Sequence, residues 1–323
     1  MSETVIRWGI LGAANFARNH MGPAIHAARG AKLAAVASSS ADKVAGFAEF
    51  APGVRHHTSY DDLLADPEID AVYIPLPNHI HVEWAIKALQ AGKPVLCEKP
   101  IGMDVAQIDR LIAVRDDCGV LAAEAFMIVH HPQWQRAKEL LEAGTIGNLC
   151  HVSAAFSYFN NDVDNIRNQA AVGGGGLRDI GCYVLGSVRY VTGQEPQGLD
   201  YARVEFENGV DVFADMGFRF DGFTYQGYTA IRMAPRQEVQ FHGDKGVISL
   251  TAPFNAGVFD QAEVVVSTPD LTRRVERFPG VNHYVLQVEA FGRALKEGSE
   301  YAWPLEQARG TQAMVDQVLA HSA

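Results

Sequence analysis

Residues 5–17 are Val-Ile-Arg-Trp-Gly-Ile-Leu-Gly-Ala-Ala-Asn-Phe-Ala, an apolar run that leads through Gly12 into helix-forming residues. A strand, a tight turn at a small residue and a helix N-terminus form the setting of a dinucleotide site, because the helix offers free N–H groups to a pyrophosphate. Only Gly12 is a glycine in this turn, since Ala14 and Ala17 hold the other two small-residue positions. The stretch predicts cofactor contacts from Gly12, Ala13, Ala14, Asn15 and Phe16, but a β-to-α turn without a ligand fits it as well.

The segments that follow alternate short apolar runs with amphipathic stretches, which is typical of a parallel sheet with crossover helices. Helices are expected from Asn78 to Gly92 and from Gln107 to Asp117. We therefore predict an N-terminal Rossmann domain over residues 1–123. Its expected strands are Val5–Leu11, Leu33–Ala37, Ala71–Ile74, Val95–Cys97 and Val120–Ala123.

Beyond about residue 124 the pattern changes to long β-type runs joined by turn signals such as Asn208-Gly209. One helix is expected at Pro132–Glu142 before these runs, and two more after residue 284. Residues 124–323 are therefore predicted to form a second, α+β domain. Its expected strands are Leu149–Phe159, Tyr201–Phe206, Val210–Phe218, Glu238–Phe241, Val247–Leu250 and Glu263–Ser267.

Composition excludes several classes of protein. The 27 Lys and Arg against 38 Asp and Glu give a net charge of −11, which opposes binding to nucleic acid or to anionic membranes. The four cysteines form no C-x-x-C pair, and adjacent histidines such as His56 and His57 point apart on a strand, so we expect no metal site. The first residues show no basic segment followed by an apolar one, and a cytoplasmic protein is expected.

The end of the second predicted strand bears on the choice between NAD and NADP. An acidic residue there would bind the ribose 2′-hydroxyl of NAD, but the chain reads Ala37-Ser-Ser-Ser, followed by Lys43. Hydroxyls and an ammonium suit a 2′-phosphate, so Ser38, Ser39 and Lys43 favour NADP. A helix cap at Ser40 with an exposed Lys43 is the alternative.

Three further motifs resemble those of the Gfo/Idh/MocA family of oxidoreductases, in the same order and spacing. They are Tyr73-Ile-Pro-Leu-Pro-Asn-His-Ile-His81, Ala91-Gly-Lys-Pro-Val-Leu-Cys-Glu-Lys-Pro100 and Gly173-Gly-Gly-Gly-Leu-Arg-Asp-Ile-Gly-Cys-Tyr183. The resemblance implies a Rossmann domain, a C-terminal domain with an open and predominantly antiparallel sheet, and NAD(P)-dependent oxidation or reduction of sugars. It also implies a homodimer or homotetramer formed through the outer face of that sheet.

Many members of the family carry His four residues after the Asp, where this chain has Tyr183. This difference resembles the branch that contains glucose-fructose oxidoreductase, xylose dehydrogenase and dihydrodiol dehydrogenase. The expected reaction is hydride transfer between the anomeric carbon of an aldose and NADP, from pyranose to lactone. An aldose-aldose oxidoreductase with tightly bound NADP(H), a dihydrodiol or carbonyl reductase, and a cofactor-sensing regulator without catalysis stay open as alternatives.

The reaction needs one proton carrier and a group that stabilises a developing alkoxide. Tyr183 is the expected proton carrier and Lys99 the ammonium that would lower its pKa, although either could make the direct transfer. Asp179 lies one helical turn before Tyr183 and could orient a hydroxyl or Lys99. A partly buried, hydrogen-bonded pair is the alternative reading of Asp179 and Tyr183.

The resemblance also implies further contacts. Cofactor contacts are expected from Pro75, Leu76, Asn78, His81, Glu98 and Lys99. Substrate contacts are expected from Asp179, Tyr183 and Lys99. Asn160 and Arg167 lie in a polar stretch ahead of the glycines that could also line the sugar pocket, but a solvated loop fits this stretch equally well. The glycines 173–176 would let the backbone approach the nicotinamide or the substrate, or they form a flexible loop before a helix.

Overall fold

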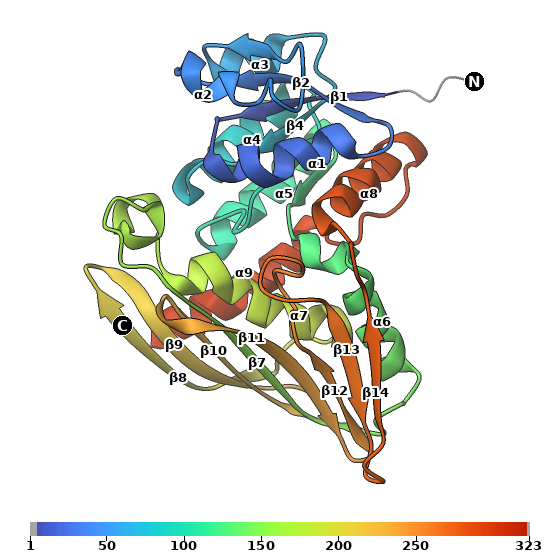
Figure 1. Ribbon diagram of the computed structural model, residues 1–323. Coiled ribbons are helices and arrows are strands. Elements are labelled where there is room, and N and C mark those ends of the chain that lie inside the picture. Colours follow the sequence, from blue (N-terminus) through green and yellow to red (C-terminus); the bar gives the residue numbers. More distant parts are fainter. Residues whose placement is uncertain (1–4, 322–323) are drawn as a thin grey trace. The chain divides into compact units, whose positions relative to one another are not determined.

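The structure is a computed structural model that describes residues 5–321 (Figure 1). The chain forms two compact units. The first comprises the chain up to His130 together with Asn282–Ala308, and the second comprises His131–Val281 and the residues from Arg309 onward.

A parallel sheet of six strands forms the centre of the first unit, in the order β3-β2-β1-β4-β5-β6. All neighbouring strands in it are parallel. The chain proceeds outward from β1 in one direction through β2 and β3, and in the other through β4 to β6. The bounds are β1 Ile6–Leu11, β2 Ala31–Ala37, β3 Arg55–His57, β4 Ala71–Ile74, β5 Val95–Cys97 and β6 Ala122–Glu124. The predicted Rossmann topology is confirmed.

Five helices of the first unit connect successive strands of its sheet, namely α1 Gly22–Ala27, α2 Ala41–Ala45, α3 Tyr60–Ala65, α4 His81–Gln90 and α5 Val105–Cys118. A sixth helix, α8 His283–Glu297, comes from a distant part of the chain. A turn of π-helix, η1 Ala17–Met21, leads into α1, and a 3-10 turn, η2 Asn78–Ile80, leads into α4. Asn78 was expected to cap a helix, but it begins this 3-10 turn instead.

The position of α8 differs from the expected division into residues 1–123 and 124–323. Residues 282–308 belong to the first unit, because α8 packs against α1 and β2. Phe291 of α8 lies 5.3 Å from Trp8 of β1, measured between ring centroids, and both side chains are fully buried. Burying two large aromatic side chains favours this association strongly, which is the physical reason for the difference.

An eight-stranded sheet dominates the second unit, in the order β14-β13-β12-β11-β7-β10-β9-β8. Its pairs are antiparallel except β7 with β10, so the expected open and predominantly antiparallel sheet is confirmed. The bounds are β7 Leu149–Phe159, β8 Gly198–Glu207, β9 Val210–Arg219, β10 Thr224–Ala230, β11 Arg232–Gly243, β12 Gly246–Leu250, β13 Glu263–Ser267 and β14 Arg273–Arg277.

One face of this sheet is covered by helices (Figure 1). Helix α7, Cys182–Thr192, packs on β7 and β10, while α6, Pro132–Glu142, packs on β12 and β13. Arg189 of α7 is buried and donates to Thr311 of α9, Leu305–His321, at 2.8 Å. The opposite face carries a pocket with polar and apolar walls, lined among others by Gln226, Tyr228 and Arg236.

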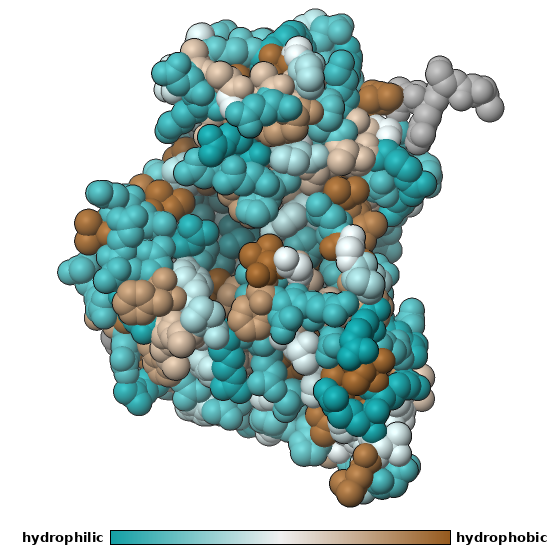
Figure 2. All heavy atoms as spheres, viewed as in Figure 1, coloured by the Kyte–Doolittle hydropathy of each residue, from teal (hydrophilic) through white to brown (hydrophobic). Residues whose placement is uncertain are grey.

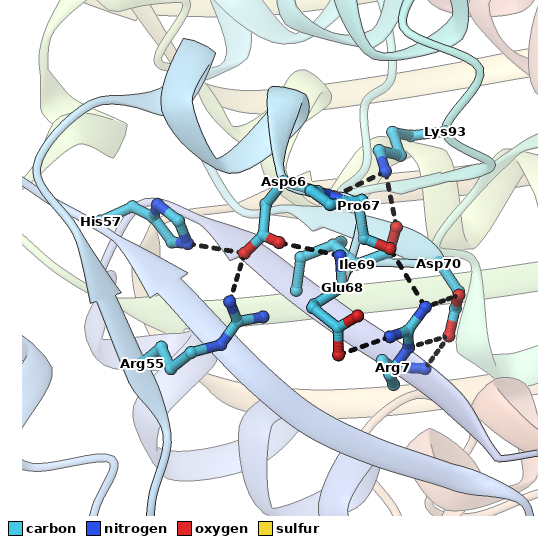
Figure 3. A network of polar contacts seen from close by, with 9 residues as sticks. All are labelled: Arg7, Arg55, His57, Asp66, Pro67, Glu68, Ile69, Asp70 and Lys93. Carbon is cyan, nitrogen blue, oxygen red and sulfur yellow. Dashed lines mark hydrogen bonds and ion pairs between the residues drawn. The ribbon is translucent and has the colours of Figure 1, made fainter.

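Ion pairs and hydrogen bonds hold the loop between α3 and β4 in the first unit (Figure 3). Asp66 accepts from Arg55 at 2.6 Å and from His57 at 3.0 Å. Lys93 donates to the Asp66 and Ile69 carbonyls, and Arg7 binds the Asp70 carboxylate. These basic side chains therefore stabilise the loop and join it to neighbouring parts of the first unit.

Exposed apolar side chains are scattered. Figure 2 shows one face of the molecule, where hydrophobic residues form small groups separated by hydrophilic ones. The most exposed large apolar residues include Leu271 at 92%, Val258 at 76% and Val163 at 71%. Within residues 5–321 no helix combines the length and the apolar character that a membrane span requires.

Candidate functional site

In the first unit, loops leave the carboxyl ends of three adjacent strands, β1, β4 and β5. Because these strands are parallel, the loops share one edge of the sheet, and strand order reverses between β1 and β4. Open α/β sheets bind their ligands at this point. The loops do meet, since a side chain on Gly12 after β1 would lie 2.8 Å from Leu76 after β4.

Gly12 has the backbone conformation that the predicted turn requires. Its φ is +104°, a region that L-residues avoid, and its N–H donates to the Ala37 carbonyl at 2.9 Å. Helical turns begin at Asn15, so the helix starts directly after the turn. The first N–H groups of a helix have no partner within it, which makes this turn suitable for an anion.

The end of β2 has the residues expected of a 2′-phosphate site and also the helix cap that was the alternative. Ser40 caps α2, with its hydroxyl accepting from the Lys43 N–H at 3.4 Å. Ser38 is nearly buried and its hydroxyl accepts from the Ser40 N–H at 3.2 Å, whereas Ser39 and Lys43 are exposed. The cap leaves the Lys43 ammonium and the Ser39 hydroxyl at the surface.

The loop after β5 carries Glu98 and Lys99. The Tyr73 hydroxyl of β4 donates to Glu98 at 2.5 Å, and the Lys99 N–H donates to the other carboxylate oxygen at 3.3 Å. Burial raises the pKa of Glu98, while Lys99 and the Tyr73 hydrogen bond oppose the rise. Burial and Glu98 both raise the pKa of Tyr73, which therefore stays a hydrogen-bond donor.

His81 does not fit its expected role as a nicotinamide contact. Its side chain is fully buried, and its two ring nitrogens contact the Leu76 carbonyl at 2.6 Å and the Pro100 carbonyl at 2.9 Å. It has no surface for a ligand and no ring nitrogen left to bind one. This expectation is wrong because the ring is used to join two loops of the protein. Pro75 and Leu76 are also buried, whereas Asn78 is partly exposed.

In the second unit, Asp179 lies in a turn of π-helix, Leu177–Gly181, that leads into α7. The Tyr158 hydroxyl at the end of β7 donates to Asp179 at 2.5 Å, and Arg167 Nε donates to the same carboxylate oxygen at 2.8 Å. The Asp179 side chain is 12% exposed and that of Arg167 is 39% exposed. The attraction of Asp179 raises the pKa of Arg167, and burial raises that of Tyr158, so the carboxylate has one cationic and one neutral donor.

Tyr183 is in the first turn of α7 and is 6% exposed. Its ring packs against Phe156 at 5.8 Å and Phe254 at 5.6 Å between centroids. Its electrostatic interaction with Arg167 helps to raise the pKa of that side chain. The expected residues Asp179, Tyr183 and Arg167 therefore form one cluster within this unit. Tyr158 belongs to the same cluster but has no motif in the sequence that could have revealed it.

Three glycines of the run, Gly174, Gly175 and Gly176, pack against the protein's own chain. A side chain on Gly174 would lie 2.6 Å from the Arg167 carbonyl, and one on Gly175, whose φ is +117°, would overlap the Asp211 carboxylate. Asp211 of β9 accepts from the Leu177 N–H at 2.6 Å and is 2% exposed. Close packing against the protein's own chain is therefore sufficient to require glycine at positions 174 and 175.

Asp211 therefore anchors the helical turn that carries Asp179, which the sequence did not indicate. Burial raises its pKa to about 6, although the Leu177 N–H and nearby Arg178 oppose the rise.

Asn160, expected to contact substrate, uses its side-chain oxygen to accept from Asp162 N–H and Asn168 Nδ2 within its own loop.

Residues 5–321 contain no group of three or more His, Cys, Asp or Glu side chains that could hold a metal ion. His56 contacts the Ser38 carbonyl and His57 contacts Asp66, so these adjacent rings have separate partners. His130 contacts the Tyr301 hydroxyl, and His131 accepts from the Gln133 N–H at the start of α6.

Comparison with known proteins agrees with this architecture. A family model described as oxidoreductase family, NAD-binding Rossmann fold, of the Gfo/Idh/MocA group, matches residues 6–126. A Gfo/Idh/MocA C-terminal domain model matches residues 134–249.

Three similar proteins cover nearly the whole chain. An uncharacterized oxidoreductase of Rhizobium meliloti is 36% identical over 322 residues, which span 97% of this chain and 96% of the relative. D-xylose 1-dehydrogenase (NADP(+)) 2 of Haloferax volcanii is 33% identical over 90% of this chain and 89% of its own. The crystal structure of a 3-ketoreductase from Actinomadura kijaniata with NADP and TDP-benzene superposes with a TM-score of 0.91, at 31% identity and 98% coverage of both chains. The chain belongs to the Gfo/Idh/MocA family of oxidoreductases.

Proposed function

We propose that this chain is an NADP-dependent oxidoreductase that transfers hydride between nicotinamide and a carbinol carbon of a sugar, specifically the anomeric carbon of an aldose. The observation that carries the proposal is the shared edge of β1, β4 and β5, where the Gly12 turn, the loop at Leu76 and Lys99 occur together in one unit. This edge is the ligand-binding edge of open α/β sheets.

The residues of this edge fit a dinucleotide. The turn at Gly12 would hold the pyrophosphate with the first N–H groups of the following helix, from Ala13 to Phe16. Ser38, Ser39 and the exposed Lys43 would hold a 2′-phosphate, and no carboxylate stands at the end of β2 to prefer NAD. Leu76, Asn78 and Glu98 would contact the nicotinamide half. The cofactor, when bound, accepts or gives the hydride.

Lys99 and Tyr183 are the proposed proton-transfer groups. The Lys99 ammonium would stabilise the developing alkoxide and keep the phenol of Tyr183 acidic enough to exchange a proton. Asp179 would accept from a sugar hydroxyl, since it is an acceptor fixed by Tyr158 and Arg167 with part of its surface exposed. Arg167 retains exposed surface that would contact the sugar, and we propose Asn160 as a weaker contact.

A second candidate function is the reduction of a keto sugar. It is favoured by the similarity to the 3-ketoreductase from Actinomadura kijaniata, for which structures with a lysine or a tyrosine replaced also exist. Lysine and tyrosine are the residue types proposed here. Two further candidates act on other substrates. One is a dihydrodiol or carbonyl reductase, and the other is a catalyst that shuttles hydride between two aldoses and also retains its NADP(H).

We further propose a homodimer or homotetramer that associates through the uncovered face of the eight-stranded sheet, where Gln226, Tyr228 and Arg236 surround a pocket. A cytoplasmic location is supported by the four cysteines, Cys97, Cys118, Cys150 and Cys182, none of which is joined in a disulfide bond.

A substrate panel tests the proposal. The purified chain is mixed with NADP or NAD and with aldoses, polyols, keto sugars or dihydrodiols, and absorbance of the reduced nicotinamide is followed. We expect turnover of an aldose with NADP at a kcat/KM at least about tenfold above that with NAD. Turnover confined to keto sugars supports the second candidate, and cofactor binding without turnover of any substrate overturns both in favour of a regulator.

A further inference from the structure

The short loop that carries Lys99 is fixed on both sides by buried side chains. Before Lys99, the Tyr73 hydroxyl holds Glu98 at 2.5 Å. After it, His81 Nδ1 contacts the Pro100 carbonyl at 2.9 Å, and the Ile101 N–H donates to Glu124 Oε1 at 3.0 Å. Three different elements of the first unit therefore contact three successive parts of this loop.

Glu124 joins the loop to a distant segment. It is 4% exposed at the end of β6, and its second oxygen accepts from Trp303 Nε1 at 2.9 Å. Trp303 is itself 1% exposed and stacks on Phe126 at 4.4 Å between ring centroids. A carboxylate with partners on both oxygens in a buried place is rigid, because each lost partner would leave a desolvated donor unsatisfied.

His81 joins the loops after β4 and β5. Its ring contacts the Leu76 carbonyl at 2.6 Å as well as the Pro100 carbonyl, and carbonyls only accept hydrogen bonds. A neutral imidazole can donate to one of them, and a doubly protonated ring can donate to both. Burial lowers the pKa of His81, the two carbonyls act in the opposite direction, and the nearby Lys99 and His79 add to the lowering.

We infer that His81 and Glu124 are positioning residues for Lys99, holding its backbone in place without touching substrate or cofactor themselves. The inference rests on the proposed catalytic role of Lys99. Both side chains are too deeply buried to reach a ligand, yet each holds a backbone group within two residues of Lys99. A small displacement of a catalytic group lowers rate steeply, which gives such positioning its value.

Chemical labelling of Lys99 tests the inference without any substrate. The full chain is treated with trace acetic anhydride from pH 6 to 10, and acetylation of each lysine is measured by peptide mass spectrometry, with exposed Lys32 as the internal reference. Replacing His81 by phenylalanine keeps a ring but removes both nitrogens. It is expected to change the rate of Lys99 acetylation by about threefold or more relative to Lys32, or to shift the pH midpoint of that acetylation, because the ammonium moves among its charged neighbours.

Two further variants complete the design. His81→Gln retains one donor and is expected to give a smaller change, while His79→Gln makes the same replacement at an exposed position of the neighbouring turn and is expected to give none. If His81→Phe does not fold, as judged by circular dichroism, His81→Gln and Glu124→Gln carry the test with the same expected direction.

An unchanged Lys99 profile in folded variants of both His81 and Glu124 would overturn the inference. The outcome is separate from that of the proposed function, since labelling needs neither cofactor nor sugar. Once a substrate is known, His81→Gln is expected to lower kcat about tenfold while the KM for NADP stays within about twofold.

Discussion

Replacing Asp211 by asparagine is expected to remove a pH dependence of the free energy of unfolding. Burial raises the pKa of Asp211 from an ordinary 3.8 to about 6 in the folded chain. The folded state therefore holds the proton more tightly than the unfolded state. This contribution to stability is complete below pH 3.8 and is lost as the pH rises through 6.

The size of the effect follows from these two values. Proton linkage between pKa 3.8 and about 6 gives a loss of about 2 kcal/mol between pH 4.5 and 7.5. Asparagine has no proton to lose in this range, and its side-chain oxygen can still accept from the Leu177 N–H. The variant should therefore be relatively more stable at pH 7.5 than at pH 4.5, in comparison with the wild-type chain.

Urea unfolding at both pH values, followed by circular dichroism, measures this difference. The free energy of unfolding of Asp211→Asn minus that of the wild type should rise by about 2 kcal/mol from pH 4.5 to 7.5. Asp215→Asn, the same change on the same strand but at a partly exposed position, is the matched control, for which a change within about 0.5 kcal/mol is expected. A difference for Asp211→Asn that stays constant with pH would refute the assignment of a buried, proton-binding anchor.

Three other outcomes are expected. Lys99→Ala and Tyr183→Phe, measured separately in the substrate assay, should each lower kcat by about 10² while the Kd for NADP is retained; normal turnover by Lys99→Ala would contradict the catalytic assignment. Lys43→Ala should raise the Kd for NADP about tenfold by fluorescence titration and leave that for NAD within about twofold, and equal losses for both cofactors would argue against a 2′-phosphate contact. Burial opposes the shift, but the donors around Asp66, including Arg55, lower the pKa of this carboxyl in the folded chain. The resulting stabilisation is present above the pKa of an ordinary Asp and is lost as the pH falls through the lower pKa of the folded state. Arg55→Met should therefore raise the pH at the midpoint of acid unfolding, and an unchanged midpoint would show that the pair contributes nothing to stability.

Local patterns in the sequence were sufficient for much of the fold. The bounds of β5, α6, β7 and β13 agree with the predicted ranges, since each is an apolar or amphipathic run ended by turn residues. Strand β10, Thr224–Ala230, was not predicted because its alternation of small and polar residues is weak. It is a strand because β7 and β9 pair with it on its two sides, and this pairing is a tertiary effect.

The first candidate site was partly predictable for the same reason. The turn at Gly12 and the end of β2 each lie within a few consecutive residues, so the spacing itself indicates the strand, the turn and the helix start. His81 was misjudged because its motif gives its place in the chain but not its partners. The carbonyls that occupy its ring belong to Leu76 and Pro100, and the second of these lies 19 residues away.

The sequence by itself determined the family, most of the strands, the glycine turn and the identities of Lys99, Asp179 and Tyr183, because these depend on residue type and short spacing. Only the tertiary structure decided what surrounds these residues. It brought Tyr158 and Arg167 into hydrogen bonds with Asp179, packed Asp211 against Gly175 and Gly176, and included α8 in the first unit. The reason is physical: a buried polar group must find a partner, and the partner is selected by which strands and helices pack side by side rather than by distance along the chain.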